Sequence, residues 1–284
     1  MPMRAPGTGR FSVIIPTLQR SDDLDALVRQ CAEHDDVLEV LVINNAPSPL
    51  SWPSPKVRVF QQNENIFVNP AWNLGAAAAQ GEYLAIVNDD VLFSDDVFPY
   101  AARLLADGNV GLVGPSPRAF GRFAGGRIRH RLASDYSLRR GFGTCMMLRR
   151  EDYVPIPESI KVWGGDSWLL LVQKYPSVEL LGTRFRTEMS TTAGSPELQA
   201  FRRQEAEESF RILAPLVGTR QWHAAAGRLA RRHARGQGRR QGLSGGGSHR
   251  TSASWPGLFH SETLTARAEP LRAPPPALAR GVAT

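Results

Sequence analysis

Short apolar runs alternate with amphipathic, helix-length segments along the first half of the chain. Runs of β-branched and aliphatic residues that stop at polar or turn residues predict buried strands, and they lie at residues 11–17, 37–43, 56–62, 81–90 and 110–115. Helices are predicted between them, starting at a Ser21 cap, at Asn69-Pro70 and at a Ser94 cap. This alternation predicts an α/β fold with a mostly parallel central sheet flanked by helices.

The second half is less regular. A basic stretch, residues 118–140, is expected to be a solvated face or a lid over an anionic ligand. Further strands are predicted at 141–148 and 178–189, with an apolar helix opening in "GGDSW" between them and a last helix from Ser195 to Leu213. From about Gly218 the composition shifts to Arg, Gly, Ala, Ser and Pro, which predicts a disordered tail.

Charge also separates the tail from the rest of the chain. Of the 34 Lys and Arg residues and the 27 Asp and Glu residues, eleven Arg and two Glu follow Gly218, so the tail carries +9 and the remainder −2. The basicity of the whole chain is therefore weak support for a nucleic-acid-binding domain. We expect the tail to act at most as an electrostatic tether to an anionic surface.

Two cysteines, Cys31 and Cys145, are too few and too far apart for a disulfide framework or a cysteine-based zinc site. Both lie in apolar patterns and are expected to be buried free thiols, which fits a reducing compartment. No apolar run approaches the roughly 18 residues that span a bilayer, and "MPMRAPGTGR" has no apolar core of a signal peptide. We therefore expect a soluble, cytoplasmic protein without a transmembrane segment.

Polar side chains follow three of the predicted strands where each strand ends. They are Pro16-Thr17, Asn44-Asn45 and Asn88-Asp89-Asp90. Ligands of parallel α/β sheets bind beyond the carboxyl ends of the strands. Paired carboxylates there suit Mg²⁺ or Mn²⁺ bound together with phosphate oxygens, whereas the alternative is a polar turn that caps a helix.

The order of these segments resembles the family 2 glycosyltransferases of the GT-A fold. The resemblance rests on "FSVIIPTLQR", "VLVINN", "NENIFVNPAWNLGAAAAQGEYLAIVNDDVLF", "GFGTCMMLRREDY" and "VWGGDSWLL", and covers roughly Phe11 to Leu213. It implies a single Rossmann-like domain that transfers a sugar from a nucleoside-diphosphate sugar, with a UDP-sugar favoured and Mn²⁺ or Mg²⁺ as cofactor. The acceptor stays open among glycans, lipid-linked sugars, proteins, small molecules and modified bases.

The resemblance also implies roles for single residues in donor binding. Pro16, Thr17 and Arg20 match the first nucleotide-contacting loop, and Asn45 matches a position, usually acidic, that meets the base or ribose. Asn73 and Gly75 match a helix that lines the donor pocket. From chemistry alone, however, they are an ordinary helix residue and a packing glycine.

For the metal, the resemblance implies that Asn88, Asp89 and Asp90 form the family's Asp-x-Asp motif. Asp90 is then the preferred metal ligand, and Asp89 a ligand or a ribose contact. Many relatives complete the coordination with a His after the last strand. This chain has none there, so that Glu188 or a water would substitute, or the dependence on the metal would be weaker.

For catalysis, "GGDSW" stands where the family has a Glu-Asp pair. Gly165 replaces the first member and leaves Asp166 as the candidate general base, opposite the leaving diphosphate, which predicts inversion at the anomeric carbon. The alternative for Asp166 is a helix N-cap.

We expect a flexible segment at 1–10, a nucleotide-sugar-binding half at 11–114, an acceptor and catalytic half at 115–217 and the tail at 218–284. Two other functions stay open: a catalytically impaired binding protein of the same fold, favoured by Asn88, Gly165 and the missing His, and a sugar nucleotidyltransferase. The latter needs a glycine-rich loop after the first strand, and "IIPTLQRSDD" contains no glycine.

Overall fold

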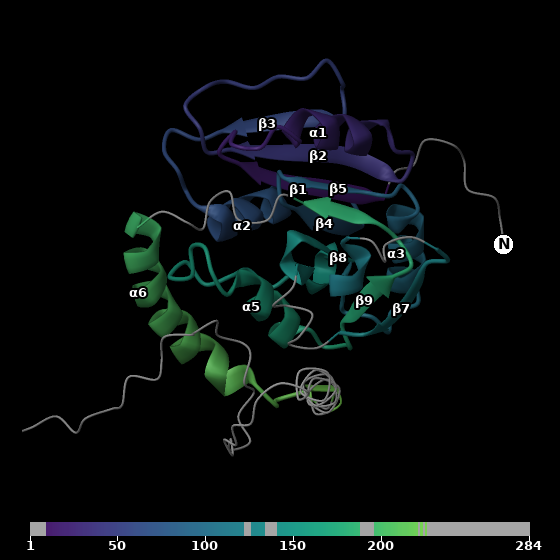
Figure 1. Ribbon diagram of the computed structural model, residues 1–284, viewed down its shortest axis with the longest axis vertical. Coiled ribbons are helices and arrows are strands. Elements are labelled where there is room, and N and C mark those ends of the chain that lie inside the picture. The colour runs from purple at the N-terminus through teal and green to yellow at the C-terminus, as the bar shows by residue number, and fades with distance from the viewer. Residues whose placement is uncertain are drawn as a thin grey trace, which may run out of the picture.

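The computed structural model describes residues 10–121, 126–133, 141–187, 196–220, 222, 223 and 225, without the side chains of 196–204. Over this part of the chain an eight-stranded sheet runs through the centre (Figure 1). In spatial order its strands are β3 (Val57–Gln61), β2 (Val37–Asn44), β1 (Phe11–Thr17), β4 (Tyr83–Val87), β8 (Cys145–Arg149), β6 (Leu112–Pro115), β9 (Val178–Leu181) and β7 (Arg129–Leu132).

The parallel part of the sheet is its first half. β3, β2, β1 and β4 are parallel neighbours, whereas β8 runs antiparallel to both β4 and β6. β6 and β9 are parallel again, and β7 closes the edge antiparallel to β9. Every residue of β1 is buried, as expected of a strand covered on both faces. The carboxyl ends of β1, β2 and β4 therefore meet at one edge of the sheet.

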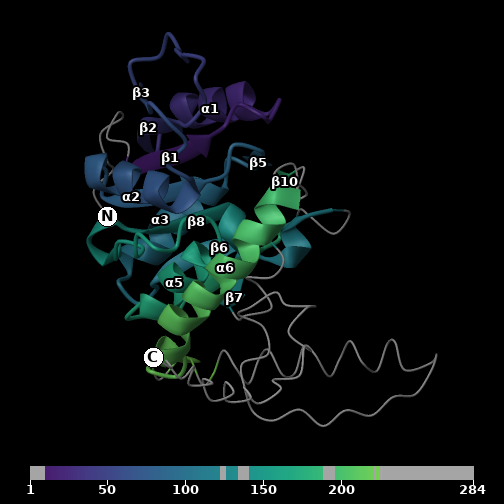
Figure 2. The same ribbon diagram turned by 90° about the vertical axis from the view of Figure 1, so that its left-hand side faces the viewer.

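Helices cover both faces of the sheet (Figures 1 and 2). α1 (Leu24–Glu33) and α3 (Val97–Ala106) pack into one core with the side chains of one face, among them Val13 and Val40. α2 (Val68–Ala78) and α5 (Gly165–Val172) pack into a second core on the other face, and α6 (Pro196–Leu213) lies outside α5. The predicted α/β class and flanked sheet are confirmed.

The two predicted serine caps are wrong. α1 begins one residue after Asp23, and the hydroxyl of Ser21 accepts a hydrogen bond from the Asp23 amide at 3.1 Å. Ser94 similarly precedes α3 by a turn, since its carbonyl accepts the Val97 amide at 3.1 Å and α3 begins at Val97. In both places the serine closes a turn before the helix.

Two further segments differ from prediction. The strand expected at 178–189 is divided, because Gly182 has a φ of +71° and turns the chain after β9. The following β10 (Phe185–Thr187) pairs with β5 (Val91–Phe93) in a separate two-stranded sheet. The basic stretch, expected to be irregular, contains β7.

The tail boundary at Gly218 is too early. Trp222 is 8% exposed and His223 is fully buried, and the Trp222 indole donates a hydrogen bond to the Gln173 carbonyl at 3.2 Å. Trp222 belongs to the same apolar core as α2 and α5. The folded domain therefore extends at least to His223, whereas the prediction of disorder beyond residue 225 lies outside the described residues.

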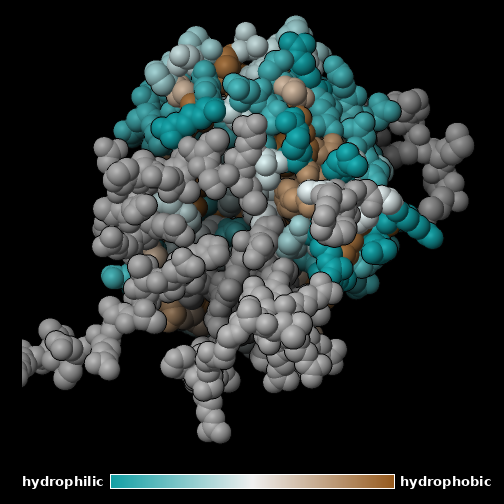
Figure 3. All heavy atoms as spheres, viewed as in Figure 1, coloured by the Kyte–Doolittle hydropathy of each residue, from teal (hydrophilic) through white to brown (hydrophobic). Residues whose placement is uncertain are grey.

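The surface and the thiols agree with the composition. Figure 3 shows a largely hydrophilic face over β1 to β3, interrupted by small apolar patches. Cys31 and Cys145 are free and buried as predicted, and burial raises the pKa of both thiols. Within the described residues, no helix combines the length and the hydropathy needed to cross a membrane.

Candidate functional site

The turn at Asn88–Asp90 joins two different sheets. β4 ends at Val87 in the central sheet, and β5 leaves it at Val91 to pair with β10. This explains why apolar residues resume directly after two carboxylates, since both flanking strands are buried in the core on the α1 and α3 side. Asp89 and Asp90 are half-buried where the strands diverge.

A hydroxyl group holds each of the two carboxylates. Thr17, at the end of β1, donates to Asp89 Oδ2 at 2.5 Å, and Thr187, at the end of β10, donates to Asp90 Oδ2 at 3.0 Å. Burial raises the pKa of Asp89, the hydrogen bond from Thr17 lowers it, and the negative charge of Asp90 raises it further; the net pKa is raised. Thr17 and Thr187 thus orient one oxygen of each carboxylate.

These two carboxylates fit a divalent cation. Oxygen ligands are what Mg²⁺ and Mn²⁺ require, and a cation beside Asp89 would offset the burial that raises its pKa. Across the described part of the chain, no three His, Cys, Asp or Glu side chains form a complete metal-binding group. Glu188, the predicted additional ligand, follows Thr187 directly and lies outside the described residues.

The ends of β1 and β2 are joined by a polar network beside the carboxylates. The Asn45 amide donates to the Thr17 carbonyl at 2.9 Å, and the Asn45 side chain accepts from the Ile66 amide at 3.3 Å. Gln19, at a φ of +57°, donates from its backbone to the Thr17 hydroxyl at 2.8 Å and from its side chain to Asn44 at 3.0 Å. This network fixes the hydroxyl that holds Asp89.

The other predicted donor residues have different surroundings. Pro16 is buried within β1, and Arg20 is exposed just beyond it. Asn73 donates to the Ile156 carbonyl at 2.8 Å and accepts from the Tyr153 hydroxyl at 2.7 Å. A Cβ at Gly75 would lie 2.4 Å from the Ile14 side chain. Asn73 and Gly75 thus make the packing contacts of the alternative interpretation, and their role in donor binding stays a prediction.

One short segment contacts both Asp166 and the turn at Asn88–Asp90. The helical turn η2 (Phe142–Thr144) joins the two, because the Thr144 carbonyl accepts the Asn88 amide at 2.9 Å and a Cβ at Gly143 would lie 2.8 Å from Asp166 Oδ2. Asp166 is half-buried in the first turn of α5, where its carboxylate accepts the Ser167 amide at 2.7 Å. The helix N-terminus favours the ionised carboxylate.

Gly165 is required by its packing against Asn69. A Cβ at residue 165 would lie 2.1 Å from Asn69 Oδ1. Asn69 is fully buried, and its Oδ1 has no hydrogen-bond partner among the described residues. A glutamate or any other side chain at residue 165 would therefore collide with the Asn69 amide.

Sequence reasoning missed several residues that shape the site. Thr187 was read only as part of a strand, and Gln19 as part of a loop. Both side chains contact the end of a strand that is distant in the sequence, so the pattern of neighbouring residues does not reveal these contacts. Within the basic stretch, His130 on β7 contacts the Tyr100 hydroxyl at 3.0 Å.

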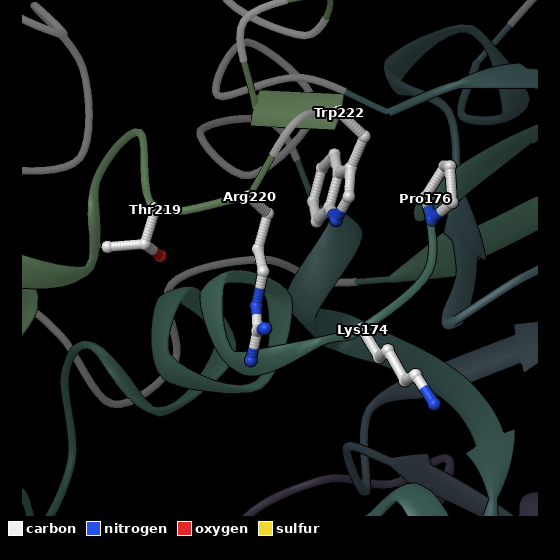
Figure 4. A pocket seen from close by; sticks show the side chains of 5 residues that line it. All are labelled: Lys174, Pro176, Thr219, Arg220 and Trp222. Atoms are coloured by element: carbon white, nitrogen blue, oxygen red, sulfur yellow. The ribbon is translucent and has the colours of Figure 1, made fainter.

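A separate cavity of about 550 Å³ lies at the other end of α5 (Figure 4). Its lining residues are Lys174, Pro176, Thr219, Arg220 and Trp222. Asp166 and Lys174 are separated by the length of α5, which at eight residues is about 12 Å. This cavity is therefore distinct from the strand-end site.

Comparisons with known proteins bear on the family and the fold of the chain. The sequence model described as Glycosyl transferase family 2 matches residues 12–158. No curated protein matches the sequence. TarS 1–349 of S. aureus in complex with UDP superposes with a TM-score of 0.55 at 16% identity, over 77% of this chain and 68% of TarS 1–349.

Two further structures are similar. TarS 1–349 in complex with UDP-GlcNAc gives a TM-score of 0.52 at 15% identity, over 70% of this chain and 66% of the other. GalNAc-T7 with UDP, GalNAc and Mn²⁺ gives 0.50 at 13% identity, over 70% of this chain and 49% of the other. At these identities the likeness is one of fold.

Proposed function

Because the chain belongs to glycosyltransferase family 2, we propose that it transfers a sugar from a nucleoside-diphosphate sugar to an acceptor hydroxyl, with inversion at the anomeric carbon. A UDP-sugar is the favoured donor, since the structures of TarS and GalNAc-T7, which are similar in fold, hold UDP or a UDP-sugar. Mn²⁺ or Mg²⁺ is the proposed cofactor.

The donor half of the site is formed by the ends of β1, β2 and β4. Thr17 and Asn45 fix the backbone beside the nucleotide, and Arg20, exposed next to them, is available for the diphosphate or the base. Asp90 and Asp89 would hold the cation, each with one carboxylate oxygen already oriented by a threonine hydroxyl. The bound cation would neutralise the negative charge that develops on the departing diphosphate.

The chemical step belongs to Asp166. Its carboxylate takes the proton of the acceptor hydroxyl while the acceptor oxygen attacks the anomeric carbon from the face opposite the diphosphate. The new carbon–oxygen bond forms as the bond to the diphosphate breaks, and the electron pair leaves with the β-phosphate oxygen. The proton remains on Asp166 and is later lost to solvent.

One observation carries this proposal: η2 touches both the Asn88–Asp90 turn and Asp166. The proposed base and the proposed cation ligands are therefore both neighbours of one three-residue turn, which supports a common role on one substrate. The alternative is a binding protein of the same fold, favoured by the missing acid at Gly165. The packing of Asn69 against Gly165 weakens that alternative. A glycine at residue 165 is explained by the lack of room for a side chain, so it is no sign that catalytic activity has been lost.

The test is the variant Asp166→Asn, which keeps the shape and the ability to accept from Ser167 but removes the basicity. The release of UDP from UDP-GlcNAc, with Mn²⁺ and water as acceptor, should fall by about 10²–10⁴, while the affinity for UDP stays unchanged. The matched control is Glu158→Gln, an exposed acid on the segment before α5. Release at the wild-type rate in Asp166→Asn would show that Asp166 only caps the helix.

A further inference from the structure

The loop that leads into α5 is bound to α2 through its backbone carbonyl groups. Asn69 donates from its side chain to the Ile160 carbonyl at 3.0 Å and from its backbone to the Lys161 carbonyl at 3.0 Å. Residues 160 and 161 are thereby attached to the helix that packs on the sheet. These bonds leave the amide groups of the loop available for another partner.

That partner is Glu205 on α6, which is 4% exposed. Its carboxylate accepts the backbone amides of Lys161, of Val162 at 2.6 Å and of Trp163 at 3.2 Å. One turn further along α6, the Ser209 hydroxyl donates to the Trp163 carbonyl at 3.1 Å. Three successive amides and a carbonyl of the loop are thus bound by α6.

The position of Asp166 depends on this arrangement. Between Trp163 and Asp166 stand only Gly164, at a φ of +91°, and Gly165. Glycine restricts the backbone less than any other residue. Two glycines before Asp166 therefore hold its carboxylate in one place only if the loop at 161–163 is itself fixed. α6 lies outside α5 in both views (Figures 1 and 2), and the Glu205 side chain on α6 is buried.

The placement of Glu205 is costly for the folded chain. Burial raises the pKa of Glu205, and the hydrogen bonds from Val162, Trp163 and Lys161 lower it only in part. An apolar residue here would avoid that cost but would leave the amides of residues 161–163 without their acceptor. What the carboxylate adds is a fixed geometry for three amides, since a single amide oxygen cannot replace both of its oxygens.

We propose that Glu205 is a positioning residue for catalysis: it holds the loop at 161–163 so that Asp166 stays beside Gly143 and faces the reacting hydroxyl. This inference rests on the proposed function. It assigns a part in the reaction to α6, which lies beyond the residues 12–158 that match the family.

The experiment is a double-mutant cycle between Glu205→Gln and Asp166→Asn in the full-length chain. The probe is UDP release from UDP-GlcNAc with Mn²⁺ and water as acceptor. Glu205→Gln should lower kcat about ten- to a hundredfold, because small displacements of a catalytic group cost that much, while KM for the donor changes less than about twofold. In the Asp166→Asn chain, Glu205→Gln should lower kcat less than about twofold, since the base it positions is already absent.

Two controls accompany the cycle. Glu207→Gln changes an exposed acid on the same helix and should leave kcat unchanged. Ser209→Ala removes only the bond to Trp163 and should give a smaller loss of kcat in the same direction, which keeps the inference testable if Glu205→Gln fails to fold.

The outcomes separate this inference from the proposed function. A normal kcat in both Glu205→Gln and Ser209→Ala, while Asp166→Asn is inactive, overturns the positioning role alone. Equal losses from Glu205→Gln with and without Asp166 also overturn it, because they indicate general destabilisation. A normal rate in Asp166→Asn overturns the proposed base, and the positioning role with it.

Discussion

Replacing Asp90 with asparagine should separate metal binding from folding. The asparagine side chain can still accept the hydrogen bond from Thr187, so the net contribution of that bond, about 1 kcal/mol, is retained. The substitution also removes a charge that raises the pKa of half-buried Asp89. The ligand-free variant should therefore melt at the wild-type temperature or slightly above it.

The ligand-bound comparison should differ strongly. With Mn²⁺ and UDP at about 100 times the dissociation constant, the wild-type chain should gain about 2.7 kcal/mol of unfolding free energy. For a domain of this size that corresponds to a rise in Tm of about 5–11 °C, since 1 kcal/mol shifts Tm by about 2–4 °C. Asp90→Asn should lose this rise.

The assay is a thermal-shift titration of UDP with Mn²⁺, repeated with EDTA in its place. The control is Asp107→Asn, an exposed acid at the end of α3 that should keep the full ligand-induced rise. An equal rise in Asp90→Asn and in the wild type, dependent on Mn²⁺ in both, would refute Asp90 as the metal ligand.

Three other predictions follow from the described contacts. Gly165→Ala should destabilise the fold by about 1–3 kcal/mol by overpacking against Asn69, measured by urea unfolding. Asn69→Gly alone should also destabilise the fold, since it removes the hydrogen bond to Ile160, but the loss in the double variant should be smaller than the sum of the two single losses; additive losses would contradict the packing argument. Trp222→Ala should cost about 3 kcal/mol, because Trp222 is 8% exposed within the core, and an unchanged midpoint would place the residue outside the folded domain. The raised pKa of Asp89 predicts that Mn²⁺ affinity, measured by calorimetry, already weakens while the pH falls toward the ordinary carboxyl pKa of 3.8, since protons compete with the cation for the carboxylate. Over the same fall in pH the ligand-free chain should become more stable, because its folded state binds that proton more tightly than the unfolded state does. An affinity that is independent of pH down to 3.8 would contradict Asp89 as a ligand.

Local patterns were sufficient for the fold class and for the residues at the strand ends. The apolar run of β4 stops at Asn88, and a parallel sheet brings that end next to Thr17 and Asn45. The order of the segments therefore predicted which polar residues meet. It also predicted burial of both thiols, because each lies within an apolar stripe or strand.

Other features depend on contacts between distant segments and left no local signal. Glu205 lies in a helix of mixed polar sequence, and only the packing of α6 shows that it meets the loop before α5. Trp222 stands in a basic, glycine-rich region, where composition masks a single buried aromatic side chain. The serine caps failed for a related reason: Ser21 and Ser94 suit a turn as well as a cap, and sequence alone does not distinguish the two.

The most direct test of the central claim is the anomeric configuration of the sugar first released from UDP-GlcNAc, followed by proton NMR with Mn²⁺ and water as acceptor. The sugar of this donor is α-linked, so a base at Asp166 opposite the diphosphate predicts that the β-anomer appears first and that Asp166→Asn nearly abolishes its release. Initial release of the α-anomer, or undiminished release from Asp166→Asn, would contradict the account.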